Sequence, residues 1–240
     1  MPKNGRKRFV TIYYQDDYVT LYHGDSRDVM ETIESVDHII TDPPYSTATH
    51  KGARTRTIGA NSDALVSFDE WTAADLDDAF KQFGKIVRGW VVATMDWRHV
   101  AKLAEQEPPG LRFVRFGVWV KPNSTPQLTG DRPAQGWEAI AFLHNSNKRL
   151  SWNGGGKRGV WTANTIPAVD HPTAKPLPLV ADWVRLFTDH GQTILDPFAG
   201  SGTTLVAAKQ EGRKAIGVEL EEKYCEIIAN RLSQGAFDFA

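Results

Sequence analysis

The fold is decided by TILDPFAGSGTTLVAAK, residues 193–209 of a chain of 240 residues. The stretch begins with the short apolar segment Thr193-Ile194-Leu195, which is typical of a buried strand, and residues 205–209 have the spacing of a helix. A glycine-rich turn joins the two. Strand, turn and helix in this order let a ligand approach a bare backbone and the positive end of a helix. The stretch therefore predicts a ligand site in an α/β fold.

The turn differs from two familiar nucleotide-binding patterns. Gly200 and Gly202 lack the third glycine of GxGxxG, and no Gly-Lys-Ser/Thr follows them as in a phosphate loop. After the helix, Gly212 is typical of a cap, and residues 214–219 are typical of the next strand. Glu219 thus ends a strand about twenty residues beyond the glycines, where a carboxylate can hold a ribose hydroxyl pair. The alternative is a solvated acid at a strand end, and the glycine turn favours the ribose role.

A second motif, Asp42-Pro43-Pro44-Tyr45, follows the largely apolar run His38-Ile39-Ile40-Thr41. This order places a carboxylate and an aromatic ring at the carboxyl end of a strand, where open α/β sheets bind ligands. Proline nitrogens cannot donate hydrogen bonds, so the turn offers acceptors only. Acceptors beside a stacking ring suit a planar base with an NH2 group. A plain strand-to-loop turn is the alternative for this motif alone. The glycine-rich turn about 150 residues later decides against it.

Three further segments accompany these motifs. They are Tyr22-His23-Gly24-Asp25-Ser26, then Trp119-Val120-Lys121-Pro122-Asn123 with Trp137-Glu138-Ala139-Ile140, and finally His171-Pro172-Thr173-Ala174-Lys175-Pro176. With Asp42-Pro43-Pro44-Tyr45 first and Phe198-Ala199-Gly200-Ser201-Gly202 last, the chain resembles a β-class amino-methyltransferase of DNA. That family uses S-adenosylmethionine to modify amino nitrogens of adenine or cytosine. The resemblance covers roughly residues 19–232, and the ordered set of motifs is highly specific.

The resemblance implies roles for individual residues. The catalytic set is Asp42, Pro43, Pro44 and Tyr45. Contacts with the cofactor S-adenosylmethionine are implied for Asp25, Asp42, His171, Thr173, Lys175, Asp196, Phe198, Gly200, Ser201, Gly202, Thr203 and Glu219. In this scheme Asp25 faces the cofactor adenine, and the loop 171–176 contacts its methionine end, where the charge of Lys175 suits a carboxylate. A histidine or lysine before proline in a loop is otherwise commonly just exposed.

Strands and helices alternate along the rest of the chain. We expect strands at 18–22, 36–40, 90–95, 113–120 and 139–144, the last two as neighbours. We expect a helix start at Thr72, which is spaced from Asp75 like a capping box, a helix over 99–106, and a core helix over 179–187. Such alternation predicts a mainly parallel sheet with helices on both faces. The resemblance implies a single methyltransferase domain, residues 1–240, with a Rossmann-like, circularly permuted sheet of seven strands.

Composition excludes several other classes of protein. Cys225 is the only cysteine, which excludes intrachain disulfides and cysteine-rich zinc sites, and its helical context predicts a small core residue. It also lacks the preceding proline of the cytosine-carbon methyltransferases. We find no ligand cluster for a metal. No apolar run of membrane length and no signal-peptide pattern occur, so we expect a soluble intracellular protein. The resemblance implies a cytoplasmic protein, bacterial or phage-encoded, that associates with the nucleoid through DNA.

Basic residues gather in loops, although the net charge is only −1. Lys51, Arg54 and Arg56 lie in the segment 46–67 that leaves from the catalytic tyrosine, and Lys148, Arg149, Lys157 and Arg158 lie in the segment 145–168. We expect both groups to contact DNA phosphates, with an affinity that salt weakens. The segment 124–136 is a third candidate for DNA contact. For the basic cluster at residues 3–8 we expect solvated surface.

The residue type at position 42 bears on the target. In the resembling family, Asp at the first catalytic position is commoner among adenine enzymes, and Ser prevails among cytosine enzymes. We therefore expect site-specific methylation of adenine N6 in double-stranded DNA, with cytosine N4 second. The remaining alternatives are a relative that binds DNA without catalysis and a methyltransferase of RNA or of a protein amide. Short recognition segments favour a homodimer, and the resemblance points to restriction–modification.

Overall fold

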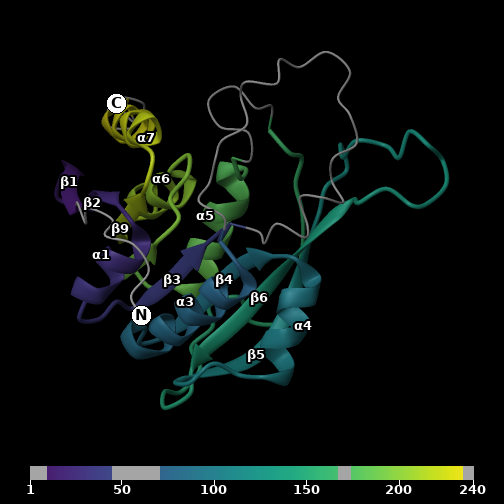
Figure 1. Cartoon of the computed structure of the whole chain (residues 1–240), viewed down its shortest axis with the longest axis horizontal. Coiled ribbons are helices and arrows are strands. Elements are labelled where there is room, and N and C mark those ends of the chain that lie inside the picture. The colour runs from purple at the N-terminus through teal and green to yellow at the C-terminus, as the bar shows by residue number, and fades with distance from the viewer. Residues whose placement is uncertain (1–9, 45–70, 167–173, 235–240) are drawn as a thin grey trace, which may run out of the picture.

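The computed structural model describes residues 10–44, 71–166 and 174–234. The described strands form one nine-stranded sheet in the order β1-β2-β9-β8-β3-β4-β6-β5-β7, with helices on both faces (Figure 1). The strands are β1 Val10–Gln15, β2 Val19–Gly24, β3 His38–Thr41, β4 Trp90–Met95, β5 Leu111–Val120, β6 Trp137–Asn145, β7 Val160–Thr162, β8 Thr193–Asp196 and β9 Lys214–Glu219. The helices are α1 Ser26–Thr32, α3 Ala73–Ile86, α4 Trp97–Glu105, α5 Leu177–Phe187, α6 Thr203–Gln210 and α7 Glu222–Gln234.

The centre of the sheet is parallel. β2 pairs with β9, β9 with β8, β8 with β3 and β3 with β4, all in parallel. The carboxyl ends of these five strands therefore meet at one edge of the sheet, which we call the carboxyl edge. β6 runs antiparallel to both β4 and β5, so the segment 121–136 between β5 and β6 starts from the same edge and projects away from the body (Figure 1).

Two layers of helices cover the sheet. Buried side chains of α5, α6 and α7 pack on one face, and those of α1, α3 and α4 pack on the other. The strands alternate between the two layers: Ile39 of β3 joins the α3 side and Ile40 the α5 side. Phe80 and Phe83 of α3 are fully buried, and burial of such a side chain contributes roughly 1.5–3 kcal/mol. Within the described ranges, no helix has the length and apolar character needed to cross a membrane.

The Rossmann-like α/β class with helices on both faces is confirmed, but the expected number of seven strands is wrong. β1 extends one side of the sheet as an antiparallel partner of β2, and the three-residue β7 extends the other. The capping box is confirmed, because Thr72 and Asp75 exchange hydrogen bonds of 2.8 and 3.2 Å. α4 begins at Trp97 rather than at the expected His99, because the Asp96 carboxylate accepts the Arg98 amide and caps the helix.

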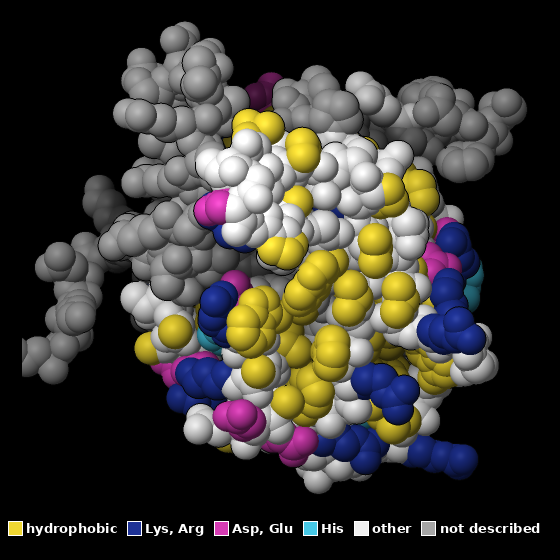
Figure 2. Space-filling model, turned by 90° about the vertical axis from the view of Figure 1, so that its right-hand side faces the viewer, with side chains coloured by type: hydrophobic (Ala, Val, Ile, Leu, Met, Phe, Trp, Pro, Cys, Tyr) yellow, Lys and Arg dark blue, Asp and Glu magenta, His cyan; other side chains and the backbone are white. Residues whose placement is uncertain are grey.

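One end of the sheet keeps apolar side chains exposed. Phe116 and Val120 of β5, Trp137 of β6 and Val160 of β7 are 36–57% exposed. Cross-strand register places all four on the face that α4 covers further along the sheet. Figure 2 shows hydrophobic side chains gathered on this side of the molecule. We call these four residues the exposed apolar face.

The Asp16 carboxylate links the hairpin between β1 and β2 to the helix α6 through hydrogen bonds. Its carboxylate accepts the Tyr18 and Val19 amides at 2.8 and 2.7 Å, and the Lys209 ammonium at 2.6 Å. Burial acts to raise the pKa of Asp16, but these hydrogen bonds and one from Tyr14 outweigh it and lower the pKa to about 2. A depressed carboxyl pKa stabilises the fold above the unfolded-state value, and this stabilisation is lost as the pH falls through the folded-state value.

We expect Asp16→Asn to lower the free energy of unfolding at pH 7 by about 2 kcal/mol. The difference from wild type should shrink between about pH 4 and pH 2, where the carboxylate of the wild type becomes protonated. Urea unfolding across this range measures it, with the exposed neighbour substitution Asp17→Asn as control. A difference that does not depend on pH would show that the charge of Asp16 plays no part.

Candidate active site

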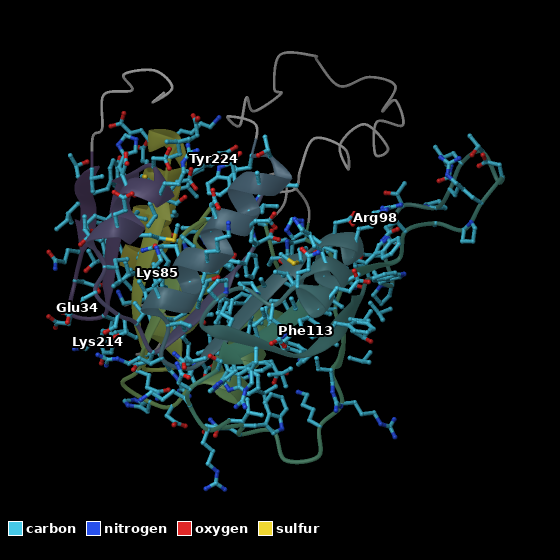
Figure 3. The ribbon with its side chains drawn as sticks, turned by 60° about the horizontal axis from the view of Figure 1, so that its bottom comes forward. Glu34, Lys85, Arg98, Phe113, Lys214 and Tyr224 are labelled. Atoms are coloured by element: carbon cyan, nitrogen blue, oxygen red, sulfur yellow. The ribbon has the colours of Figure 1, made fainter. Side chains whose placement is uncertain are left out.

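A cleft opens at the carboxyl edge, with an empty volume of ≈ 1160 Å³ that includes space open to solvent. Carboxylates from four strand ends line it: Asp25 after β2, Asp42 after β3, Asp196 in β8 and Glu219 in β9. Figure 3 shows Lys214, at the start of β9, and Tyr224, a few residues after the end of β9, at opposite ends of the molecule. Parallel strands bring their carboxyl ends together. The two sequence motifs, more than 150 residues apart, therefore meet at one edge.

Most residues of the predicted site lie in this cleft. Its lining includes Asp25, Asp42, Pro43, Pro44, Lys175, Asp196, Phe198, Gly200, Ser201, Thr203 and Glu219. Gly202 lies next to the lining, at the start of α6. Tyr45, His171 and Thr173 lie outside the described residues, so their roles stay predictions. In the ranges that the structure describes, His, Cys, Asp and Glu side chains form no group that could hold a metal ion.

The glycine turn presents bare backbone to the cleft. Gly200 and Gly202 have φ of +52° and +76°, which favour glycine. A Cβ atom on Gly202 would come within 2.8 Å of Ile228 in α7, so close packing also requires glycine here. From the same helix, Arg231 donates a hydrogen bond to the Ser201 carbonyl. The last helix thus supports the turn from outside, and the turn is shaped to receive a ligand that approaches its backbone.

Glu219 is fixed beside this turn. Its carboxylate accepts the Gly200 amide at 2.9 Å and the Glu221 amide at 2.8 Å. Burial outweighs these hydrogen bonds and raises the pKa of Glu219 to about 7. A ligand that donates hydroxyl hydrogen bonds to Glu219 favours the charged carboxylate. Glu219 is therefore able to take the ribose role that its place in the sequence predicts.

Asp196 and Asp25 organise the strand ends themselves. Asp196 accepts the Thr41 hydroxyl at 2.7 Å and the Phe198 amide at 3.1 Å, so it ties β8 to β3. Burial raises the pKa of Asp196 to about 6 despite these hydrogen bonds. Asp25 caps α1 by accepting the Arg27 amide at 2.9 Å, and it also pairs with the Arg27 guanidinium. Both side chains line the cleft, and their hydrogen bonds also fix the strand and helix ends that surround it.

Several residues of the lining were not predicted from the sequence, among them Trp71 and Arg27. The Trp71 ring, just before α3, meets the Phe198 ring edge to face at 4.8 Å, and the Arg27 guanidinium lies 5.2 Å from the Trp71 ring centroid. The Trp71 and Phe198 rings therefore offer aromatic surface to the cleft. Trp71 directly precedes the predicted capping box, which was the available signal.

The Asp42 carboxylate is held from two sides. The Thr94 hydroxyl of β4 donates to Oδ1, and the Lys175 ammonium donates to Oδ2. Nζ of Lys175 also lies 3.5 Å from Oε2 of Glu138 in β6. Burial acts to lower the pKa of Lys175, but the charges of Asp42 and Glu138 outweigh it and raise the pKa. Lys175 is therefore a permanent cation. The Asp42 side chain remains 26% exposed and can be reached from the cleft.

The basic residues expected at DNA lie away from the cleft where the structure describes them. Lys148 and Arg149 follow the end of β6, which pairs with the starts of β4 and β5, so they lie at the edge opposite Asp42. Lys157 pairs with Asp182 of α5 at 2.5 Å, and Arg158 is near the start of β7. Lys51, Arg54 and Arg56 are outside the described residues. Contact of these residues with DNA stays a prediction.

Comparisons with known proteins agree with this geometry. Residues 36–230 match the model of a family described as DNA methylase. The chain is 30% identical to the Type II methyltransferase M2.LlaDCHI of Lactococcus lactis subsp. cremoris, over 93% of each chain. It is 28% identical to the Type II methyltransferase M2.DpnII of Streptococcus pneumoniae, over 92% of this chain and 91% of that one.

Solved structures share the fold. The complex of M1.HpyAVI with SAM is 25% identical and has a TM-score of 0.69, covering 89% of this chain and 98% of that one. The PvuII DNA methyltransferase (cytosine-N4-specific) has a TM-score of 0.71 at 17% identity, covering 94% of this chain and 90% of that one.

The raised pKa of Glu219 predicts a dependence of stability on pH. A carboxyl pKa raised from 4.5 to about 7 means that the contribution of Glu219 is complete below about pH 4.5 and is lost as the pH rises through 7. Glu219→Gln cannot ionise, so the free energy of unfolding of wild type should fall relative to this variant by about 2–3 kcal/mol between pH 4.5 and 8. Urea unfolding at both pH values measures the change, and the exposed Glu105→Gln is the control. Parallel pH curves for wild type and Glu219→Gln would contradict it.

Proposed function

The chain belongs to the DNA methylase family of the N6/N4 type, and we propose that it methylates the exocyclic N6 of adenine in double-stranded DNA. Its methyl donor is S-adenosylmethionine. The observation that carries the proposal is the meeting of Asp42 with the glycine turn and Glu219 in one cleft. The finer choice of adenine rests on Asp at position 42, as opposed to Ser.

The cleft fits the cofactor. Bare backbone at Gly200, the Glu219 carboxylate at the end of β9 and the aromatic surface of Trp71 and Phe198 match the donors, hydroxyls and ring of a nucleoside. We propose that these residues and Asp25 hold its adenosine part. When bound, S-adenosylmethionine supplies an electrophilic methyl group on a positively charged sulfur. The predicted contact of Lys175 with the cofactor carboxylate stays a prediction, since its ammonium is hydrogen-bonded to Asp42.

Asp42 activates the amino group of the base in this proposal. The adenine lone pair is delocalised into the ring, so N6 is a poor nucleophile. Asp42 accepts one N–H, and the Pro43 carbonyl accepts the other, which directs the lone pair toward the methyl group. In the structure, the Thr94 hydroxyl donates to one carboxylate oxygen of Asp42 and the Lys175 ammonium donates to the other. The nitrogen–carbon bond would form as the carbon–sulfur bond breaks. The methylated nitrogen would then release to water the proton that it had donated in its hydrogen bond to Asp42.

The base must leave the duplex to reach Asp42, at a cost of roughly a few kcal/mol. Stacking on the ring of Tyr45 would offset about 1–3 kcal/mol of this. We propose the segment 124–136 as a DNA contact, since it leaves the sheet at the same edge as Asp42. The relatives M2.LlaDCHI and M2.DpnII are Type II methyltransferases. By analogy, we propose that this chain modifies DNA for a restriction–modification system.

We expect Asp42→Ala to lower methyl transfer by at least about a hundredfold, because the acceptor for the amino group is lost. Cofactor binding, measured by calorimetry, should survive the substitution. The assay supplies duplex DNA and S-adenosylmethionine with a labelled methyl group. Asp28→Ala, an acid on α1 outside the cleft lining, is the matched control. Turnover of Asp42→Ala at the wild-type rate would remove Asp42 from the mechanism.

The same assay distinguishes between the candidate methyl acceptors. Digestion of the labelled DNA to nucleosides gives N6-methyldeoxyadenosine for the proposed activity and N4-methyldeoxycytidine for the alternative. Label in RNA or in protein, with none in DNA, would exclude both. Cofactor and DNA binding without any transfer would indicate a relative that binds DNA without catalysis.

We also propose that the chain forms a homodimer through the exposed apolar face. Phe116 and Val160 are each more than half exposed, in neighbouring strands at the end of the sheet. A patch of this kind is typical of a surface that binds protein. A second copy offers the same apolar surface, and two-fold symmetry lets each patch cover the other.

The double substitution Phe116→Lys and Val160→Lys places two charges on this face, so we expect it to convert a dimer into a monomer. Sedimentation equilibrium measures the mass of each protein. Ile12→Lys, an exposed apolar residue on β1 at the far end of the sheet, is the control and should leave the dimer intact. A wild-type mass of one chain at working concentration would exclude the dimer.

A further inference from the structure

Four charged side chains form an alternating row that ends at Asp42. The Lys121 ammonium donates to Oε1 of Glu138, and Oε2 of Glu138 lies 3.5 Å from Nζ of Lys175. Lys175 in turn donates to Asp42. The order is therefore positive, negative, positive, negative, and the row as a whole is neutral. Only Asp42 and Lys175 belong to the predicted site.

A buried tryptophan keeps the row in place. Trp119 of β5 is 2% exposed, and its indole N–H donates to the Ala163 carbonyl at 2.8 Å. It lies opposite Glu138 in the β5–β6 ladder. The ammonium groups of Lys121 and Lys175 lie 4.6 and 5.9 Å from the centroid of its ring, a favourable place for a cation. Both lysines are thus held near one rigid ring, with Glu138 between them.

Glu138 is an anion in this setting. Burial acts to raise its pKa, but the charges of Lys175 and Lys121 outweigh burial and hold the pKa below its ordinary value. The side chains of Lys121, Glu138 and Lys175 are 10–21% exposed, so solvent screens these charges only in part. A change of charge at Lys121 or Glu138 therefore changes the electrostatic potential at Asp42.

We propose that Glu138 and Lys121 are positioning residues that set, through Lys175, how strongly Asp42 accepts a hydrogen bond. Glu138 shares the Lys175 ammonium with Asp42 and weakens the hold of that cation on the catalytic carboxylate. Lys121 in turn restrains Glu138. This inference rests on the proposed role of Asp42. It adds two residues that touch neither base nor cofactor.

The row predicts opposite effects of substituting Glu138 and Lys121, its two members farthest from Asp42. Glu138→Gln leaves two positive charges near Asp42 without the negative charge between them, so the acid limb of the pH–rate profile should move to lower pH. Lys121→Gln leaves Glu138 less compensated, so the acid limb should move to higher pH. We expect shifts of about one pH unit in each direction. Glu138→Gln should also lower kcat, because Lys175 then binds Asp42 alone.

Other groups near Asp42 are common to all the variants. Asp196 of β8 is the charged neighbour whose own pKa the charge of Asp42 helps to raise, and Thr94 of β4 is the neutral donor. Since neither is altered, a difference between the variants reports on the row. Lys102→Gln removes a lysine that pairs with Asp77 away from the site, and it should leave the acid limb unchanged.

The experiment measures kcat and KM against pH for wild type, the three glutamine variants and Asp42→Ala, with cofactor affinity by calorimetry and thermal unfolding of each protein. Opposite shifts of the acid limb, at wild-type cofactor affinity, support the proposal. Coincident profiles, or shifts of the same sign in Glu138→Gln and Lys121→Gln, overturn it even if both variants are less stable. If Asp42→Ala retains full turnover, the proposed function fails first, and the two failures are thus distinguished.

Discussion

The structure depends on one buried hydrogen bond between two strands, from the Thr41 hydroxyl of β3 to the Asp196 carboxylate of β8. These residues are 155 positions apart in the chain. Parallel pairing of β3 with β8 places Asp42 and the glycine turn at the same sheet edge, and the hydrogen bond fixes their two loops relative to each other. This junction is sensitive to substitution, since loss of the Thr41 hydroxyl would remove a hydrogen bond from a buried acid whose pKa is raised.

The cleft also contains carboxyl groups whose ionised forms are disfavoured by burial. Burial disfavours the ionised forms of both Asp196 and Glu219, whereas the four-charge row keeps Glu138 and Lys175 ionised by mutual pairing. Groups with shifted pKa values cluster at functional sites because ligand binding needs charges that folding alone does not favour. On the cofactor side a ligand is expected to satisfy Glu219. Near Asp42, the protein itself supplies the opposite charge through the Lys175 ammonium.

Much of this arrangement could be predicted from the sequence, because local patterns report local structure. Apolar strands, the capping box of Thr72 and the glycine turn all depend on neighbours in the chain, and they were found at or near their true positions. The strand count was wrong because β7 has three residues and β1 is largely exposed, so neither gives a clear apolar pattern. Glu138 and Trp71 lie at the site only because the fold packs them there, so no local pattern in the sequence identified them as site residues. Lys148 and Arg149 appeared suitable for DNA by charge, yet strand direction puts them at the far edge.

The support that α7 gives to the glycine turn has a consequence for the nascent protein. Ile228 and Arg231 lie behind the turn in space but after it in the chain, whereas Asp42 is translated early. Domains emerge from the ribosome from the amino terminus onward. The glycine turn therefore lacks its support until α7 has been synthesised, and a partly made chain carries Asp42, the proposed hydrogen-bond acceptor for the amino group, before the proposed cofactor site is complete.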